Sequence, residues 1–274
     1  MWALEQAWTP RRSPILANTP LALIATLSAG WLAVAGLVAA GWLVPTAVRV
    51  ASITAVHGGL LAVALTWAAA DTGASLPAHA RGVIVALVAA GATAAALDPR
   101  AAILHFAAPA WLAMLAARGR LAGLGLGPNF PLSAVLIGAA IGGLLGGHLL
   151  VSAAQTLGHP LRTESWTPLL GLWAYDAGAN VLSAECFFRG ALFNRLQRRW
   201  SFAAAAALAT AAALVRYLAD PLLPRHVEVM AGALFYLTLL GAVDCWLLWW
   251  SGSLVPGLLA SWLFFLAYRA LATG

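Results

Sequence analysis

The sequence predicts an all-α protein that crosses a lipid bilayer with a bundle of about nine helices. Hydrophobic residues make up 62% of its 274 residues and charged residues only 9%, and the mean hydropathy is +0.88. Soluble domains carry about 25% charged residues, so this chain has too few to cover an apolar core in water. The apolar residues also form runs long enough to span hydrocarbon, which takes about 20 residues per helix.

Proline, glycine and charged residues separate nine apolar runs, and we expect each run to form one helix. In chain order the runs are 21–44, 50–70, 82–97, 101–117, 132–154, 168–196, 202–218, 229–250 and 254–272. The third and fourth runs are short, and only Asp98-Pro99-Arg100 separates them. This pair is therefore expected to form a tight helical hairpin.

The chain is expected to form one transmembrane domain, residues 21–274, after a cytoplasmic N-terminal segment of residues 1–20. The first apolar run is longer than the apolar part of a signal peptide and has no convincing cleavage site, so it should remain as the first helix. We see no internal repeat in the sequence. Cys186 and Cys245 both lie inside apolar runs and are expected to be small buried residues rather than a disulfide.

The net charge of +6 comes from fifteen arginines, which are scattered between apolar runs and suit lipid headgroups better than nucleic acid. With the N-terminus in the cytoplasm, the inner segments hold Arg11, Arg12, Arg81, Arg118, Arg120, Arg195, Arg198 and Arg199. The outer segments then hold Arg49, Arg100, Arg162, Arg225 and Arg269. This excess favours a multi-pass protein of the bacterial inner membrane with its N-terminus inside and its C-terminus outside.

Ionisable residues inside the expected helices carry the chemistry, because a charge in hydrocarbon needs a partner or a function. These residues are Asp176, Glu185, Arg189, Arg216 and Asp244. Glu185 and Arg189 are four residues apart and share a helix face, so they are expected to form a structural ion pair. Asp176 lies about half a turn out of phase with Glu185 and is expected to face elsewhere.

A stretch of the sixth helix, Ala184-Glu185-Cys186-Phe187-Phe188-Arg189-Gly190, resembles the first motif of the CPBP family of intramembrane metalloproteases. That family includes the type II CAAX prenyl endopeptidase. The segment Ser251-Gly252-Ser253-Leu254-Val255-Pro256-Gly257 is similar to the family's turn into its last core helix. The resemblance covers residues 168–271 and implies a CPBP-like core.

The same resemblance implies that the catalytic residues have been replaced. The family's first glutamate, which activates water there, falls on Ala184, and its second falls on Glu185. The histidine of its second motif falls near Arg216, and the histidine and asparagine of its third motif fall on Ser261 and Phe265. A zinc site needs two or three nitrogen or oxygen ligands, so the resemblance implies a degenerate site that holds no zinc.

Arg216 is expected to fill the space of the missing histidine and to pair with Asp244 or Glu185. Its planar guanidinium could bind a carboxylate in two places. The alternative, in which its long side chain extends to the headgroups, stays open.

Glycines and histidines in the first half suggest packing and two candidate ligands. Gly138, Gly142 and Gly146 repeat every four residues on the fifth helix and allow close contact with another helix. His57 and His148 stand beside glycines, which would leave room for a tetrapyrrole, although a histidine bonded to another helix is the simpler interpretation. No cofactor is expected beyond this tetrapyrrole or a lipid.

These observations favour a non-catalytic CPBP-like scaffold or accessory subunit that binds lipids and other integral membrane proteins, but not nucleic acid. One alternative is a divergent CPBP-type peptidase that uses Glu185 with Asp244 or Asp176. The other is a small-solute transporter in which Asp176, Arg216 and Asp244 line a polar path.

Overall fold

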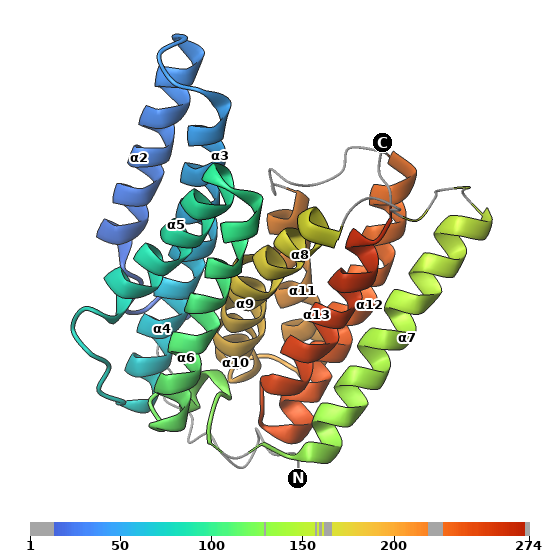
Figure 1. Ribbon diagram of the computed structural model, residues 1–274. Coiled ribbons are helices and arrows are strands. Elements are labelled where there is room, and N and C mark those ends of the chain that lie inside the picture. Colours follow the sequence, from blue (N-terminus) through green and yellow to red (C-terminus); the bar gives the residue numbers. More distant parts are fainter. Residues whose placement is uncertain are drawn as a thin grey trace.

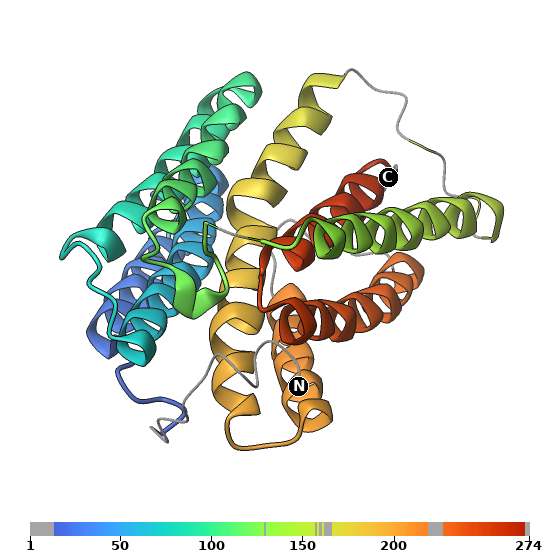
Figure 2. The same cartoon turned by 90° about the horizontal axis from the view of Figure 1, so that it is seen from below.

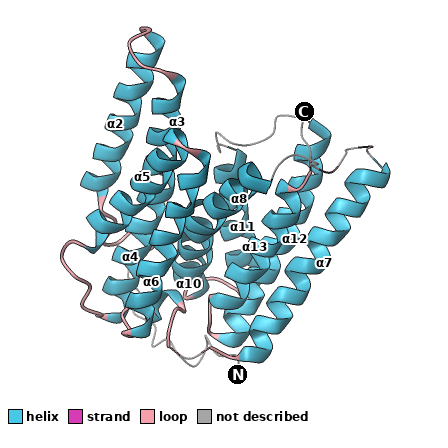
Figure 3. Cartoon of the chain, in the orientation of Figure 1, coloured by secondary structure: helices cyan, strands magenta, loops and turns pink. Residues whose placement is uncertain are grey.

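A computed structural model describes residues 14–128, 130–156, 158, 161, 166–218 and 227–271, with the side chains of 227–229 left out. Over these residues the chain forms nine helical rods and no strand (Figure 3). The first five rods are α2 (Leu21–Ala39); α3 (Pro45–Ile53) with the π-helical η1 (Thr54–Gly58) and α4 (Gly59–Thr72); α5 (Ala80–Leu97); the 3₁₀-helical η2 (Pro99–Phe106) with α6 (Ala107–Ala117); and α7 (Leu132–Thr156).

The other four rods form the second half of the molecule. They are α8 (Trp166–Tyr175), η4 (Asp176–Asn180), α9 (Val181–Ala184), η5 (Glu185–Phe193) and α10 (Asn194–Gln197) as one continuous rod; α11 (Phe202–Leu218); α12 (Val227–Ser251); and α13 (Val255–Arg269). A short 3₁₀ turn, η3 (Ala122–Leu124), precedes α7. The expected number of helices and the all-α transmembrane fold are confirmed.

Length and composition make six of the helices in the described residues capable of crossing a membrane. They are Leu21–Ala39, Pro45–Thr72, Ala80–Leu97, Pro99–Ala117, Leu132–Thr156 and Met230–Ser251. The helices α11 and α13 are apolar but shorter. Together with the composition, these helices make the chain a multi-pass membrane protein.

The rod of residues 166–197 lies between two groups of helices. Figure 2 shows α2 to α6 on one side of it and α7, α12 and α13 on the other. In Figure 1 the rod runs through the middle of the bundle, with other helices on both sides of it. Its polar residues are therefore buried by the whole fold rather than by one partner helix.

The two helix boundaries that differ most from the expected runs do so for local reasons. The first run was expected to extend to residue 44, but α2 ends at Ala39 because Gly41 takes a left-handed conformation with φ of 76°. Pro45 then begins the next helix, where a missing N–H costs nothing. The hairpin around Asp98 forms as expected, and the Asp98 carboxylate accepts a hydrogen bond from the Arg100 backbone N–H at 2.9 Å.

The glycine face of α7 lies directly against α13 of the same chain. A Cβ atom added at Gly138 would come within 2.4 Å of the Pro256 carbonyl oxygen, and one at Gly142 within 2.3 Å of the Ala260 carbonyl oxygen. One at Gly146 would lie 2.8 Å from the Ala267 Cβ. Because the obstructing atoms are mostly backbone, these contacts cannot relax by a change of side-chain rotamer.

We expect Gly142→Val to destabilise the protein by about 3 kcal/mol or more, since the valine would force α7 and α13 apart. Gly143 is the matched control, because nothing lies within 4 Å of a Cβ added there. Unfolding of purified protein in detergent, followed by tryptophan fluorescence, should show a large loss for Gly142→Val and almost none for Gly143→Val. Equal effects of the two substitutions would mean that the close contact is unimportant.

Candidate functional site

Four polar residues of the 166–197 rod lie on two widened, π-helical stretches. Asp176 and Asn180 belong to η4, and Glu185 and Arg189 belong to η5. A π-helical turn inserts a residue into the i→i+4 ladder and changes which side chains face a neighbour, and such turns are frequent at functional sites. All four side chains are buried.

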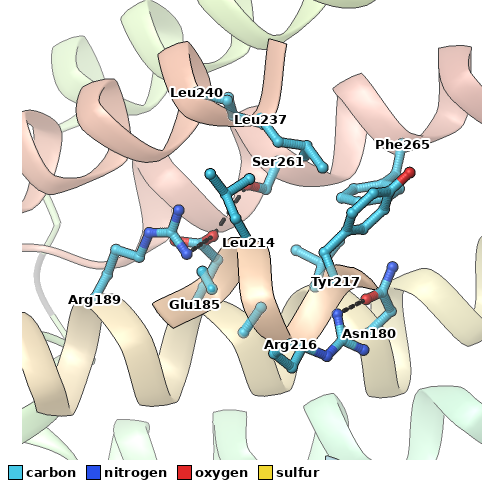
Figure 4. A pocket seen from close by; sticks show the side chains of 13 residues that line it. Asn180, Glu185, Arg189, Leu214, Arg216, Tyr217, Leu237, Leu240, Ser261 and Phe265 are labelled. Carbon is cyan, nitrogen blue, oxygen red and sulfur yellow. Dashed lines mark hydrogen bonds and ion pairs between the residues drawn. The ribbon is translucent and has the colours of Figure 1, made fainter. Parts of the chain in front are cut away.

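The six positions expected from the motif resemblance line a single cavity of about 40 Å³. These positions are Ala184, Glu185, Arg189, Arg216, Ser261 and Phe265. They come from three rods that are far apart in sequence, with further lining residues from α12 (Figure 4). The cavity has room for about one to three water molecules, by the usual requirement of 10–15 Å³ for each. It is too small for a peptide.

Two carboxyl groups contact the same hydroxyl at this site: Glu185, which lines the cavity, and Asp244, which does not line it. Ser261 Oγ lies 3.1 Å from Glu185 Oε1 and 2.8 Å from Asp244 Oδ2. Arg189 Nη1 lies 3.5 Å from Glu185 Oε1. All four residues are at most 5% exposed, so water screens their charges little. Glu185 and Arg189 thus lie beside each other, as the spacing of four residues indicated.

The hydrogen bonds of Ser261 limit the protonation of this cluster. A serine hydroxyl carries one proton and can donate it to only one carboxylate. The second contact is a hydrogen bond only if the other carboxyl group carries a proton and donates it to Ser261 Oγ. With Arg189 supplying one positive charge, the cluster is neutral when Glu185 and Asp244 together hold one proton, and this is the state that burial favours.

Asp176 belongs to a second buried group, and among the described residues its hydrogen-bond partners differ from those of Glu185, although both carboxyl groups contact α13. Its carboxylate accepts two hydrogen bonds from Arg269, from Nε at 2.8 Å and from Nη2 at 2.9 Å. Asn180 Nδ2 donates a third at 2.8 Å. Arg269 was counted among the arginines of the outer segments that indicate membrane orientation. It is only 7% exposed, so it belongs to the core instead.

The structure corrects the expected partner of Arg216. Its Nη1 donates to the Asn180 side-chain oxygen, and its Nη2 lies 3.0 Å from His57 Nε2, whereas Asp244 bonds to Ser261. Figure 4 shows Arg216 and Asn180 at one end of the cavity and Glu185 and Arg189 at the other. The guanidinium is therefore at the wrong level along the rod to reach either carboxyl group.

The two histidines considered as cofactor ligands have different surroundings and share no contact. His57 is buried, with Nδ1 2.7 Å from Ser183 Oγ and Nε2 2.9 Å from Tyr175 OH. His148 is exposed on α7, and its Nδ1 contacts Tyr236 OH. With both ring nitrogens of His57 engaged, an axial bond to a tetrapyrrole would have to break one of these hydrogen bonds.

The residues around the cavity do not fit a zinc ion. A zinc site needs several neutral imidazoles, thiolates or carboxylates that converge on one point. The corresponding positions here carry the methyl group of Ala184, the hydroxyl of Ser261 and the ring of Phe265, and the Arg189 cation stands beside the one matching carboxylate. Within the described residues, no group of three or more histidine, cysteine, aspartate or glutamate side chains could hold a metal.

One buried ion pair was missed by the sequence reading. Arg195 binds Asp71 through Nε at 3.0 Å and Nη2 at 2.9 Å, and Arg198 Nη2 lies 3.3 Å from the same carboxylate. In the sequence, Arg195 was interpreted only as one of the inner arginines that indicate membrane orientation. Asp71 near the end of a strongly apolar run was a cue, because an acidic residue there needs a cationic partner.

Comparison with known families agrees with the expected core. Residues 166–266 match the family model described as type II CAAX prenyl endopeptidase Rce1-like. The match begins at the start of α8 and ends within α13, so it contains every element that lines the cavity. No curated protein and no solved structure matches the chain.

Proposed function

We propose that this CPBP-family membrane protein, whose residues 166–266 form an Rce1-like domain, is non-catalytic and acts as a scaffold that binds other integral membrane proteins. The observation that carries the proposal is the content of the 40 Å³ cavity, which is lined by all six positions of the resemblance and has no histidine among its lining residues.

Three features of the cavity support the loss of peptidase activity. The position of the water-activating glutamate is Ala184, so the base is missing. Glu185 contacts Ser261 and Arg189 and lies in a closed group of side chains. The volume admits water but no substrate backbone. A peptidase needs a base, an activated water and access for the peptide, so these features support a non-catalytic role.

The outer face of α7 supports the binding of a partner helix. Gly143 and Gly147 are exposed, are four residues apart, and have nothing within 4 Å of a Cβ added at either position. This is the spacing that lets two transmembrane helices approach closely, and here the second helix is not one of the described rods. The inner glycine face is already filled by α13, so the outer face is the one open to another protein.

We expect the protein to co-purify in mild detergent with a membrane protein at a fixed stoichiometry, and the double substitution Gly143→Leu and Gly147→Leu to abolish this. Two leucines would hold the partner backbone several ångströms away and remove the close contact. Gly36→Leu on α2 is the matched control, because that glycine also has nothing within 4 Å of an added Cβ. Size-exclusion chromatography and quantitative mass spectrometry of the complex measure the result.

Three outcomes would contradict the proposal. Retention of the partner by the double variant would move the interface away from α7. One zinc per chain, removable by a chelator, together with peptide cleavage that Glu185→Gln abolishes, would favour a divergent peptidase. Substrate-dependent flux in liposomes would favour a transporter.

A further inference from the structure

A second cavity, of about 280 Å³, lies outside the region described above. It is bounded by α3, α5, η2 and α8. Most of its lining is apolar, with Ile53, Ala92, Ala95, Ala102 and Leu172 among the walls. Its volume approaches the lower end of the range of 300–1,000 Å³ that is usual for small-molecule sites.

The inner end of this cavity holds an unpartnered histidine. His105 is only 2% exposed, and among the described residues neither of its ring nitrogens has a hydrogen-bond partner. A Cβ added at Gly91 would lie 2.7 Å from His105 Nδ1, so Nδ1 is packed against the α5 backbone. The other edge of the ring, with Nε2, is therefore the one that a molecule in the cavity can reach.

An unpaired imidazole in this position indicates a polar group on the ligand. A buried donor or acceptor without a partner carries an unfavourable free energy of desolvation, which a hydroxyl or carbonyl group would relieve. Since Nδ1 has no acceptor, the favoured tautomer places the ring proton on Nε2, from which it can be donated into the cavity. Tyr175, which lines the same end, already contacts His57.

The mouth of the cavity carries a positive charge. Arg49 lines it and is exposed, and Pro99 and Pro168, the first or third residues of their helices, lie at the same end. Tyr175 follows Pro168 by seven residues of α-helix, which corresponds to about 10 Å between the mouth and the inner end. An anionic group at the mouth and a hydrogen-bonding group inside would thus be about 10 Å apart.

We propose that this cavity binds a small amphipathic acid, whose carboxylate pairs with Arg49, whose apolar body lies along the alanine walls, and whose far end hydrogen-bonds to His105. A lipid acyl chain fits less well, because its methyl end would leave the imidazole unpaired. The site shares no lining residue with the 40 Å³ cavity, so it is independent of the scaffold role.

The test compares 4-hydroxycinnamate with cinnamate, which lacks only the hydroxyl group, by titration calorimetry of the full chain in detergent. We expect 4-hydroxycinnamate to bind about tenfold more tightly, the usual value of one added hydrogen bond. His105→Phe should remove this difference, and Arg49→Gln should weaken the binding of both acids. Chromatography and thermal unfolding would show that each variant is folded.

A variant that leaves both polar residues in place keeps the test decisive. Ala95→Leu should fill the cavity and abolish binding, whereas Ala90→Leu, an exposed position of α5 outside the cavity, should not. The proposal is overturned if neither acid binds, if binding survives Ala95→Leu, or if the tenfold preference survives His105→Phe. It is also overturned if dodecanoate binds more tightly than 4-hydroxycinnamate irrespective of residue 105.

Discussion

Replacing Asp71 by alanine is expected to lower the free energy of unfolding by about 3–5 kcal/mol. The substitution would leave Arg195 buried with its main counter-charge gone, since the Arg195 side chain is only 2% exposed. Arg198, whose Nη2 lies 3.3 Å from the same carboxylate, would lose its acidic partner as well. Unfolding followed by tryptophan fluorescence in detergent measures the loss.

The environment of Arg195 makes this effect large. Its Nη1 donates to the backbone carbonyls of Ile15 at 2.7 Å and Ala17 at 2.8 Å, and its guanidinium lies 4.2 Å from the ring centre of Trp67. These contacts hold the arginine in place and prevent it from extending to water. Loss of Asp71 should therefore also loosen the chain before α2, which limited proteolysis would detect.

Asp98→Ala is the control, because Asp98 is exposed and accepts a single cap hydrogen bond from the Arg100 backbone. Loss of a cap of this kind typically costs about 1 kcal/mol. The double substitution Asp71→Ala and Arg195→Met should be less damaging than Asp71→Ala alone, because it removes the uncompensated charge. Equal losses for Asp71→Ala and Asp98→Ala would show that the ion pair contributes little.

The sequence was sufficient for the number and order of the helices because hydrophobicity and chain breaks determine both. The run 202–218 is α11 to the residue, and Asp98-Pro99-Arg100 does separate two helices. It could not predict the π-helical stretches η4 and η5, because hydrophobic periodicity does not distinguish a π-helical turn from a continuing α-helix. The domain limits and the orientation of the N-terminus stay predictions, and residues 1–13 lie outside the described part.

The candidate site was predictable in its members but not in their pairing. The motif resemblance selected six positions, and all six line one cavity. This worked because helical register and the family resemblance determine which residues face inward. The predicted partner of Arg216 was wrong because the partner depends on the relative axial position of two packed helices. Residue spacing within one helix does not determine that position. The same limit hid the contact between Asp176 and Arg269, which are 93 residues apart.

Replacing Arg189 by alanine should be the most damaging change in the 40 Å³ cavity, at about 3–5 kcal/mol. Its guanidinium is the cation beside two carboxyl groups that share the hydroxyl of Ser261. Without it, Glu185 and Asp244 would have to take up a second proton or leave a carboxylate buried without a counter-charge, and either requirement opposes folding.

A neutral replacement of the whole cluster separates this electrostatic cost from a loss of packing. In the triple variant Arg189→Met, Glu185→Gln and Asp244→Asn, no charge remains and the volumes are nearly conserved, so the loss should be less than half of that for Arg189→Ala alone. Fluorescence-detected unfolding of both variants in one detergent makes the comparison. Arg189 packs closely against α12, since a Cβ added at Gly241 would come within 2.6 Å of its Nη2. If the triple variant proved as unstable as Arg189→Ala, the contribution of Arg189 would lie in this packing and not in its charge.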